Sequence, residues 1–126
     1  MKNTSKNYTD IEQSKKLIEL GIDVNTADML YRWHDERWYC VPKDVPYPYS
    51  LKDMIPAWSL SALLDLMPYE ITIKEDNTPY KLLVTHKLVH YPRLTTMWPS
   101  IYSVEANTTL DAAFEVICEL LEDKII

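Results

Sequence analysis

Glycine is nearly absent from this chain of 126 residues, in which Gly21 is the only one. Phosphate-binding loops, dinucleotide-binding turns, nucleophile elbows and EF-hand loops all need glycine where the backbone approaches a ligand or takes a positive φ. The sequence therefore argues against all four of these classes of site.

Cysteines and long apolar runs are also scarce. The two cysteines, Cys40 and Cys118, are too few for a disulfide framework. Uncharged stretches such as residues 54–64 are interrupted by Pro and Ser and fall short of the roughly 20 apolar residues of a membrane span. Residues 1–10 hold no apolar signal-peptide core. We therefore expect a cytoplasmic protein with free thiols and no membrane contact.

What remains has the composition of a globular protein with an acidic balance. The chain has 13 Lys and Arg against 19 Asp and Glu, a net charge of −6, and 47% hydrophobic residues. This length suits one domain. We expect a single domain over residues 9–126, preceded by a flexible polar segment at residues 1–8.

The first predicted helix covers residues 10–20. Thr9 is the expected N-cap, and Glu12 three residues later completes a capping box. Gly21 ends the helix because glycine readily takes the left-handed conformation at a helix C-terminus. A short helical turn is expected at residues 25–28.

Two further helices follow from apolar residues at helical spacing. The second covers residues 60–67, begins after the N-cap Ser59 and ends before Pro68. The third begins after Thr108 or Thr109. Its apolar stripe consists of Leu110, Ala113, Phe114, Ile117, Cys118 and Leu121.

Alternating apolar and polar residues predict five strands. The first two form a hairpin connected by residues 34–37, and the next two form a longer hairpin with its turn at residues 75–77. The strands cover residues 29–33, 38–41, 69–74, 79–91 and 96–104. The predicted fold class is α+β: an antiparallel sheet of three to five strands with about three helices packed on one face.

Metal and thiol chemistry find little support in the sequence. His34, Asp35 and Glu36 could join His86 in a site of two His and a carboxylate if the first hairpin folded over the sheet. On one strand, His86 and His90 would lie about 13 Å apart and could not share an ion.

The two cysteines lack an activating pattern. Cys118 lies on the apolar stripe of the last helix, as a small core residue would, and no neighbouring motif marks Cys40 as a nucleophile. We therefore expect no catalytic residue, no metal site and no cofactor, and the sequence favours a protein that is not an enzyme.

Tyrosine and tryptophan are abundant, at nine and four against a single Phe. Many of them gather in the first predicted hairpin and in the proline-rich loop at residues 42–50. Tyr and Trp are enriched at protein interfaces, although packing in the core is the ordinary role of any one of them. The candidate protein-binding residues are Tyr31, Trp33, Trp38, Tyr39, Tyr47 and Tyr49.

An alternative surface lies in residues 77–104, which contain no Asp or Glu but include basic and aromatic residues. Such a combination on a sheet is typical of binding to nucleotides or single-stranded nucleic acid. The overall acidity of the chain opposes this reading. The candidate residues are Lys81, Lys87, Arg93, Tyr91 and Trp98.

Three segments carry a resemblance: residues 17–29 (LIELGIDVNTADM), 55–68 (IPAWSLSALLDLMP) and 111–124 (DAAFEVICELLEDK). Together they resemble small uncharacterised proteins encoded on prophages and other mobile elements of gut bacteria. The resemblance implies a bacterial or viral setting and an accessory protein that binds another protein. The leading hypothesis is therefore a non-enzymatic accessory protein that contacts an unidentified protein partner through the aromatic hairpin and the proline loop.

Overall fold

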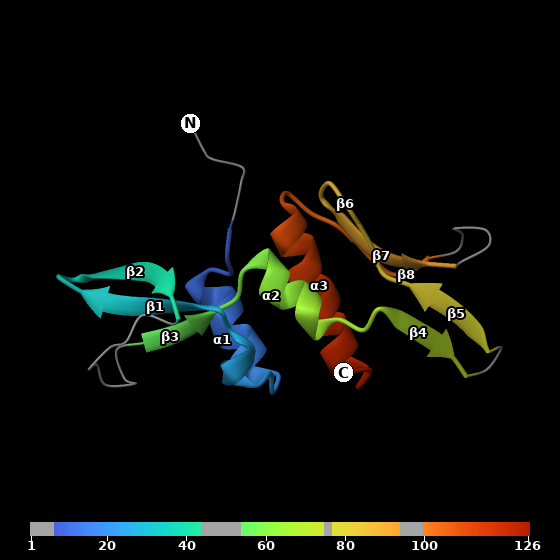
Figure 1. The fold of residues 1–126 in the computed structure, drawn as a ribbon, viewed down its shortest axis with the longest axis horizontal. Coiled ribbons are helices and arrows are strands. Elements are labelled where there is room, and N and C mark those ends of the chain that lie inside the picture. Colours follow the sequence, from blue (N-terminus) through green and yellow to red (C-terminus); the bar gives the residue numbers. More distant parts are fainter. Residues whose placement is uncertain (1–6, 44–53, 75–76, 94–99) are drawn as a thin grey trace.

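The computed structural model describes residues 7–43, 54–74, 77–93 and 100–126 (Figure 1). Within these residues the chain forms an α+β fold of three α-helices and eight antiparallel strands, which confirms the predicted class. The helices are α1 (Ile11–Glu19), α2 (Leu60–Leu66) and α3 (Thr109–Glu122). The strands are β1 (Met29–His34), β2 (Arg37–Pro42), β3 (Met54–Ala57), β4 (Glu70–Ile73), β5 (Thr78–Lys81), β6 (Leu83–Thr85), β7 (Leu88–Pro92) and β8 (Ser100–Glu105).

The described strands divide among three small sheets, with the orders β2-β1-β3, β4-β5 and β6-β7-β8. The helices lie between the first sheet and the other two (Figure 1). α1 contacts β3 on one side, and α3 contacts β7 and β8 on the other. Strands on opposite sides of the helices cannot share backbone hydrogen bonds, which is why the described strands do not form one continuous sheet.

The N-cap of α1 differs from the predicted one. The side chain of Asp10 accepts the backbone N–H of Gln13 at 2.8 Å, and the side chain of Gln13 accepts the N–H of Asp10 at 3.1 Å. The capping box therefore uses this pair, and the prediction of Thr9 and Glu12 was wrong. Thr9 is fully buried, and its hydroxyl bonds to the Ser14 hydroxyl at 2.8 Å instead.

The end of α1 follows the prediction. Gly21 has a φ of +101°, and the N–H of Ile22 reaches back to the carbonyl of Leu17 at 3.0 Å, as in a Schellman motif. The expected helical turn is a 3₁₀ turn, η1 (Val24–Thr26), which lies slightly earlier than predicted because Asp23 caps it.

α2 and α3 begin where the sequence placed them. The side chains of Ser59 and Thr108 accept the N–H groups of Ala62 and Asp111, respectively. Leu110, Ala113 and Ile117 of the predicted stripe of α3 are buried, whereas Phe114, Cys118 and Leu121 are half-buried. The helix also buries Ala112, Val116 and Leu120, which the spacing did not single out. Capping residues therefore predict the starts of both helices, and apolar spacing predicts the buried face of α3 only in part.

The β1–β2 connection is shorter than the predicted four residues. His34 pairs with Arg37, which leaves a two-residue turn of Asp35 and Glu36. Both turn residues have positive φ, at 49° and 63°. Positive φ at both central positions is the mark of a type I′ turn, whose twist matches that of the flanking strands.

The predicted strand over residues 79–91 is wrong, since this stretch contains three strands. β5 ends at Lys81, and β6 and β7 form a hairpin that turns at His86 and Lys87, where Lys87 has a φ of +64°. This two-residue turn contains no glycine, and the alternation of apolar and polar residues continues across it from β6 into β7. The pattern therefore gave no sign of the turn.

One cluster of buried apolar side chains extends through the three helices and the two C-terminal sheets. Trp58, Leu63, Val89, Tyr91 and Ile117 are among its fully buried members. In contrast, every residue of β1 and β2 keeps some exposure to solvent. β1 and β2 therefore lie at the edge of the molecule, outside the core, whereas Ala57 of β3 is fully buried.

Tyr8, which the sequence placed in the flexible segment at residues 1–8, packs against the domain. It forms a β-bridge with Ser59, and its ring meets the edge of the Tyr31 ring with centroids 5.9 Å apart. The packed chain therefore includes Tyr8.

Candidate functional site

The sheet β2-β1-β3, which we call the aromatic sheet, carries the leading candidate residues. Its register places Trp33 opposite Trp38, and Tyr31 between Cys40 and Ile55. Because directly opposed residues share a face, these five side chains lie on one side of the sheet, which we call the Trp face. Tyr39 belongs to the opposite side.

The two tryptophans of the Trp face form a pair. Their rings meet edge to face, with centroids 5.3 Å apart and an angle of 67° between the planes. Trp33 is 44% exposed, and Trp38 is half-buried. An opposed aromatic pair of this kind stabilises two strands by roughly 0.2–1 kcal/mol. It also presents a broad apolar surface to solvent.

Tyr31 has a different role from its neighbours on the Trp face. Its hydroxyl donates to the carbonyl of Thr9 at 2.8 Å, and the Tyr8 ring packs against it. Burial raises the pKa of the Tyr31 hydroxyl above its usual range. Tyr31 therefore anchors the aromatic sheet to the N-terminal segment, and the exposed part of the candidate surface is concentrated at the hairpin.

The opposite side of the aromatic sheet carries Tyr39, which is 39% exposed. Its ring lies 6.5 Å from the imidazole of His34, centroid to centroid, and half-buried Leu30 and Val41 share its side of the sheet. Apolar side chains thus face outward on both sides of the hairpin. Tyr47 and Tyr49 of the proline loop lie outside the described residues.

The alternative basic surface is only partly assembled. An isolated bridge between Tyr80 and Arg93 brings the end of β5, with Lys81, next to the end of β7. Lys87 lies at the opposite end of β7, six residues from Arg93 and therefore roughly 20 Å away. These three cations do not form one patch.

The aromatic residues expected on the basic surface, Tyr91 and Trp98, are not seen on it in the described structure. Tyr91 is fully buried, and its hydroxyl donates to the carbonyl of Pro68 at 2.7 Å, so its ring has no face for a base to stack on. The prediction of Tyr91 as a binding residue is therefore corrected: it belongs to the core. Trp98 lies outside the described residues.

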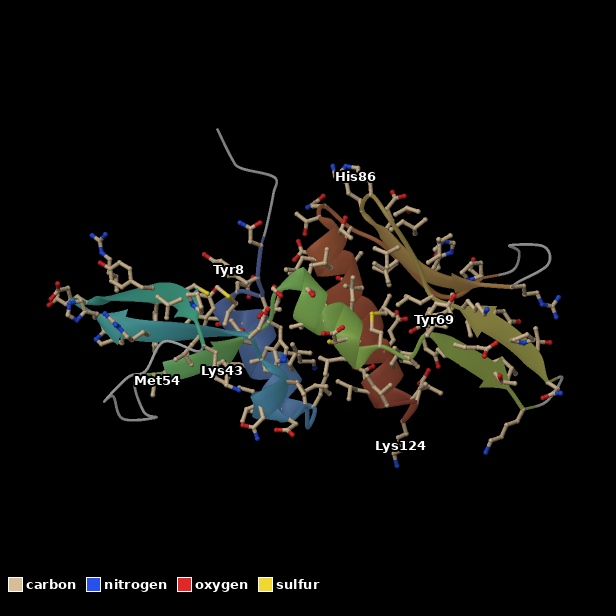
Figure 2. All side chains as sticks on the ribbon, in the orientation of Figure 1. Tyr8, Lys43, Met54, Tyr69, His86 and Lys124 are labelled. Carbon is tan, nitrogen blue, oxygen red and sulfur yellow. The ribbon has the colours of Figure 1, made fainter. Side chains whose placement is uncertain are left out.

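The suggested two-His site is not assembled. Figure 2 shows His86 at the β6–β7 turn, on the far side of the helices from the hairpin that holds His34. Among the described residues, no group of three His, Cys, Asp or Glu side chains is placed to hold a metal ion.

Neither thiol is placed as a nucleophile. Burial raises the pKa of Cys40 and that of Cys118 to about 11. For Cys118 the carboxylates of Glu115, Glu119 and Glu122 add to the increase, and Lys16 opposes it. A thiol of this kind is almost wholly protonated at neutral pH, and the thiolate is the reactive form.

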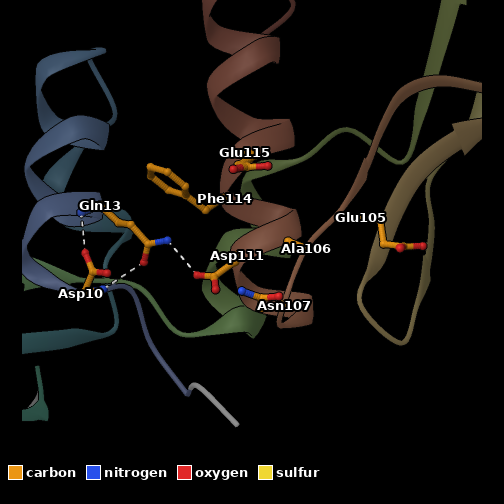
Figure 3. A pocket seen from close by; sticks show the side chains of 8 residues that line it. All are labelled: Asp10, Gln13, Glu105, Ala106, Asn107, Asp111, Phe114 and Glu115. Atoms are coloured by element: carbon orange, nitrogen blue, oxygen red, sulfur yellow. Dashed lines mark hydrogen bonds between the residues drawn. The ribbon is translucent and has the colours of Figure 1, made fainter. Parts of the chain in front are cut away.

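A cavity of about 460 Å³ lies where the start of α1 meets the start of α3 (Figure 3). Its lining holds four carboxylates, two amides and one aromatic ring. The residues are Asp10, Gln13, Glu105, Ala106, Asn107, Asp111, Phe114 and Glu115. The sequence analysis missed this site, because its defining contact joins residues 98 positions apart: the Gln13 side-chain amide donates to Asp111 at 2.8 Å.

The acidic character of this cavity has a structural cause. Asp10 caps α1, and Asp111 lies in the first turn of α3. Carboxylates at these positions offset the partial positive charge of a helix N-terminus. The lining contains no His, Cys, Ser or Lys that could act with them as a nucleophile or proton acceptor. The carboxylates of Asp10 and Asp111 thus serve the starts of the two helices, and the Gln13–Asp111 hydrogen bond joins those helices.

Comparison with models of protein families, with curated proteins and with solved structures finds nothing that matches this chain. No helix in the described part of the chain combines the length and the apolar character needed to span a membrane. Any functional assignment therefore depends on the geometry of the chain itself.

Proposed function

We propose that this protein is a non-enzymatic accessory protein that binds a protein partner through the aromatic sheet. The observation that carries the proposal is a three-stranded sheet that displays Trp33, Trp38 and Tyr39 to solvent while β1 and β2 contribute no fully buried side chain. Because these two strands add no fully buried side chain to the core, their exposed aromatic side chains are available to contact a partner.

The chemistry of these side chains supports the proposal. Tyr and Trp provide large contact areas with few rotatable bonds, and they dominate the binding energy of many protein interfaces. The aromatic sheet offers them on both sides, next to half-buried apolar residues such as Val41. The mobile-element setting and the cytoplasmic location are part of the same proposal and rest on the resemblance and the composition.

The test is capture of partners from bacterial lysate by the tagged protein, with and without nuclease. Trp33→Thr and Tyr39→Thr remove the rings but retain residues that favour strands. The matched control is Tyr69→Thr, since Tyr69 is 67% exposed and lies on the other side of the helices (Figure 2). We expect Trp33→Thr to weaken partner binding about tenfold or more, as hot-spot residues do. The control should bind like the wild type.

Equal binding by all variants, with unchanged thermal unfolding, would contradict the assignment of this surface. The alternative of nucleotide or single-stranded nucleic-acid binding keeps the support of Lys81 and Arg93, which lie near each other. Its expected result is bound material that nuclease removes and that rising salt releases.

A further inference from the structure

β2 forms an outer edge of the aromatic sheet. The strand order is β2-β1-β3, and no described residue pairs with the side of β2 that faces away from β1 (Figure 1). The Lys43 N–H donates to the Asp28 carbonyl at 3.1 Å, which identifies this pair as a hydrogen-bonded one. Because such pairs alternate along an antiparallel ladder, the backbone groups of Trp38 and Cys40 point outward.

The middle of this edge lacks the features that usually prevent strand pairing, and β2 has them only at its ends, Arg37 and Pro42. Natural edge strands are protected by charged side chains, prolines, bulges or very short length. β2 pairs with β1 over six consecutive positions without a shift in register, and its segment 38–41 carries no charge and no proline. The edge is therefore a regular template for another strand.

We propose that β2 pairs antiparallel with β2 of a second copy of this chain, around a two-fold axis at Tyr39. Trp38 and Cys40 of the second copy then exchange both backbone hydrogen bonds, and symmetry repeats this pair. A register centred on Cys40 would instead set Trp38 opposite Pro42, which has no N–H to donate. The Tyr39 register therefore satisfies the outward groups best.

Charge complementarity favours a second copy of this chain as the strand that pairs with the outer edge of β2. In this register the acidic turn of Asp35 and Glu36 of one copy lies beside Lys43 of the other, at both ends of the interface. Arg37 lies opposite an uncharged residue, Val41. The aromatic sheet and its turn carry two basic and two acidic residues, although the whole chain has a net charge of −6. The sheet therefore has no net charge, which limits the repulsion between two acidic chains that meet there.

The pairing of two β2 strands extends the proposed function and rests on it, because both use the aromatic sheet. A two-fold axis perpendicular to the sheet joins the two copies into six strands, with both Trp faces on the same side. A partner would then meet two Trp33–Trp38 pairs at once. Such a surface gains apparent affinity for a partner with two matching sites.

The first test is the mass of the protein in solution by light scattering, with a reductant present. We expect the wild type to have twice the monomer mass. Cys40→Pro removes an outward N–H without breaking the ladder to β1 and should weaken the dimer about tenfold or more. The matched control Cys40→Ala keeps the backbone and should remain dimeric. A monomeric wild type, or a dimer unaffected by Cys40→Pro, would overturn the proposal.

The second test examines the register. Tyr39→Lys and Tyr39→Glu should each be monomeric, because like charges would meet at the axis, and a mixture of the two should form a heterodimer. Tyr39→Cys in a Cys40→Ala background should form an intermolecular disulfide, since the Cα atoms of an opposed pair that is not hydrogen-bonded lie about 4.5 Å apart, within the range of Cα separations that a disulfide spans. Tyr69→Cys in the same background should not. Failure of the mixture to pair, or equal cross-linking at both positions, would overturn the register.

Partner capture by the same variants separates the two proposals. If the wild type is monomeric but loses its partner on Trp33→Thr, dimerisation is wrong and the proposed function stands. If the dimer follows the expected pattern but no partner depends on Trp33, the dimer stands and the proposed function fails. A strand of another protein bound along β2 of a monomer would also overturn the second copy as the occupant.

Discussion

Thr9 joins three parts of the chain through one buried residue. Its hydroxyl accepts the backbone N–H of Trp58 at 3.1 Å and bonds to the Ser14 hydroxyl, while its own N–H donates to the Trp58 carbonyl at 2.9 Å. The N-terminal segment, α1 and the residues before α2 therefore share one set of hydrogen bonds. No water can replace a lost partner at a fully buried position without a cavity to hold it.

Thr9→Val tests this arrangement because valine keeps the shape and removes the hydroxyl. The Trp58 N–H loses its acceptor and the Ser14 hydroxyl loses its partner, so we expect a loss of about 1–3 kcal/mol in the free energy of unfolding. Unfolding in urea measures this loss in the free energy of unfolding. The matched control is Thr72→Val, at an exposed strand position, which should change little. A Thr9→Val variant as stable as this control would refute the role.

At the scale of elements, the β1–β2 hairpin turns through Asp35 and Glu36, of which glutamate is unusual in a type I′ turn. Asparagine and glycine dominate such turns, because a side chain at positive φ brings Cβ close to the backbone. Here Asp35 and Glu36 occupy both positions. The strain at Glu36 is offset by the pairing on either side, including the Trp33–Trp38 contact.

Glu36→Gly should therefore stabilise the hairpin. Relief of the left-handed conformation is worth roughly 1–2 kcal/mol and is partly offset by the greater freedom of glycine in the unfolded chain. We expect a gain of about 0.5–1 kcal/mol, seen as slower amide hydrogen exchange in β1 and β2. Glu36→Ala removes the same carboxylate without relieving the backbone and should show no gain. Equal exchange rates in both variants would contradict the explanation.

The helices and strands differ in how far the sequence alone could predict them. Apolar spacing with Ser59, Thr108 and Gly21 located the helices, because helix signals are local. The β6–β7 turn at His86 and Lys87 was missed, since a turn without glycine leaves the alternation intact. The density of Tyr and Trp identified the aromatic sheet as a candidate surface. Nothing local distinguishes the exposed Trp33 from the buried Tyr91, because their burial depends on which elements pack against them.

At the scale of the whole molecule, His90 links stability to pH. It is only 8% exposed, and its Nδ1 lies 2.9 Å from the Ser100 hydroxyl, which joins β7 to β8. Burial lowers the pKa of His90 below its usual value of 6.5. The folded protein thus holds the ring neutral at a pH where the unfolded chain binds a proton.

The direction in which stability changes with pH follows from this difference in proton uptake between the folded and unfolded chain. The stability that neutral His90 contributes is present above the unfolded-state pKa and is lost as the pH falls below about 6.5 toward the folded-state pKa. We expect the urea midpoint to decrease between about pH 7.5 and pH 5.5, and His90→Gln to lessen that decrease. Glu119, whose pKa burial raises, acts in the opposite direction in both proteins and cancels in the comparison. Identical pH profiles for the two proteins would rule out the effect.

The three tryptophans among the described residues give two separate optical signals. Trp58 is fully buried and donates its indole N–H to Thr26 at 2.9 Å, whereas Trp33 meets both solvent and the ring of Trp38. Collisional quenchers in solution should therefore reach the emission of the hairpin pair and leave that of Trp58 largely shielded. The close pair should also add an exciton signal to the circular dichroism spectrum. Spectroscopy can thus follow the aromatic sheet and the core as two independent reporters in one unlabelled molecule.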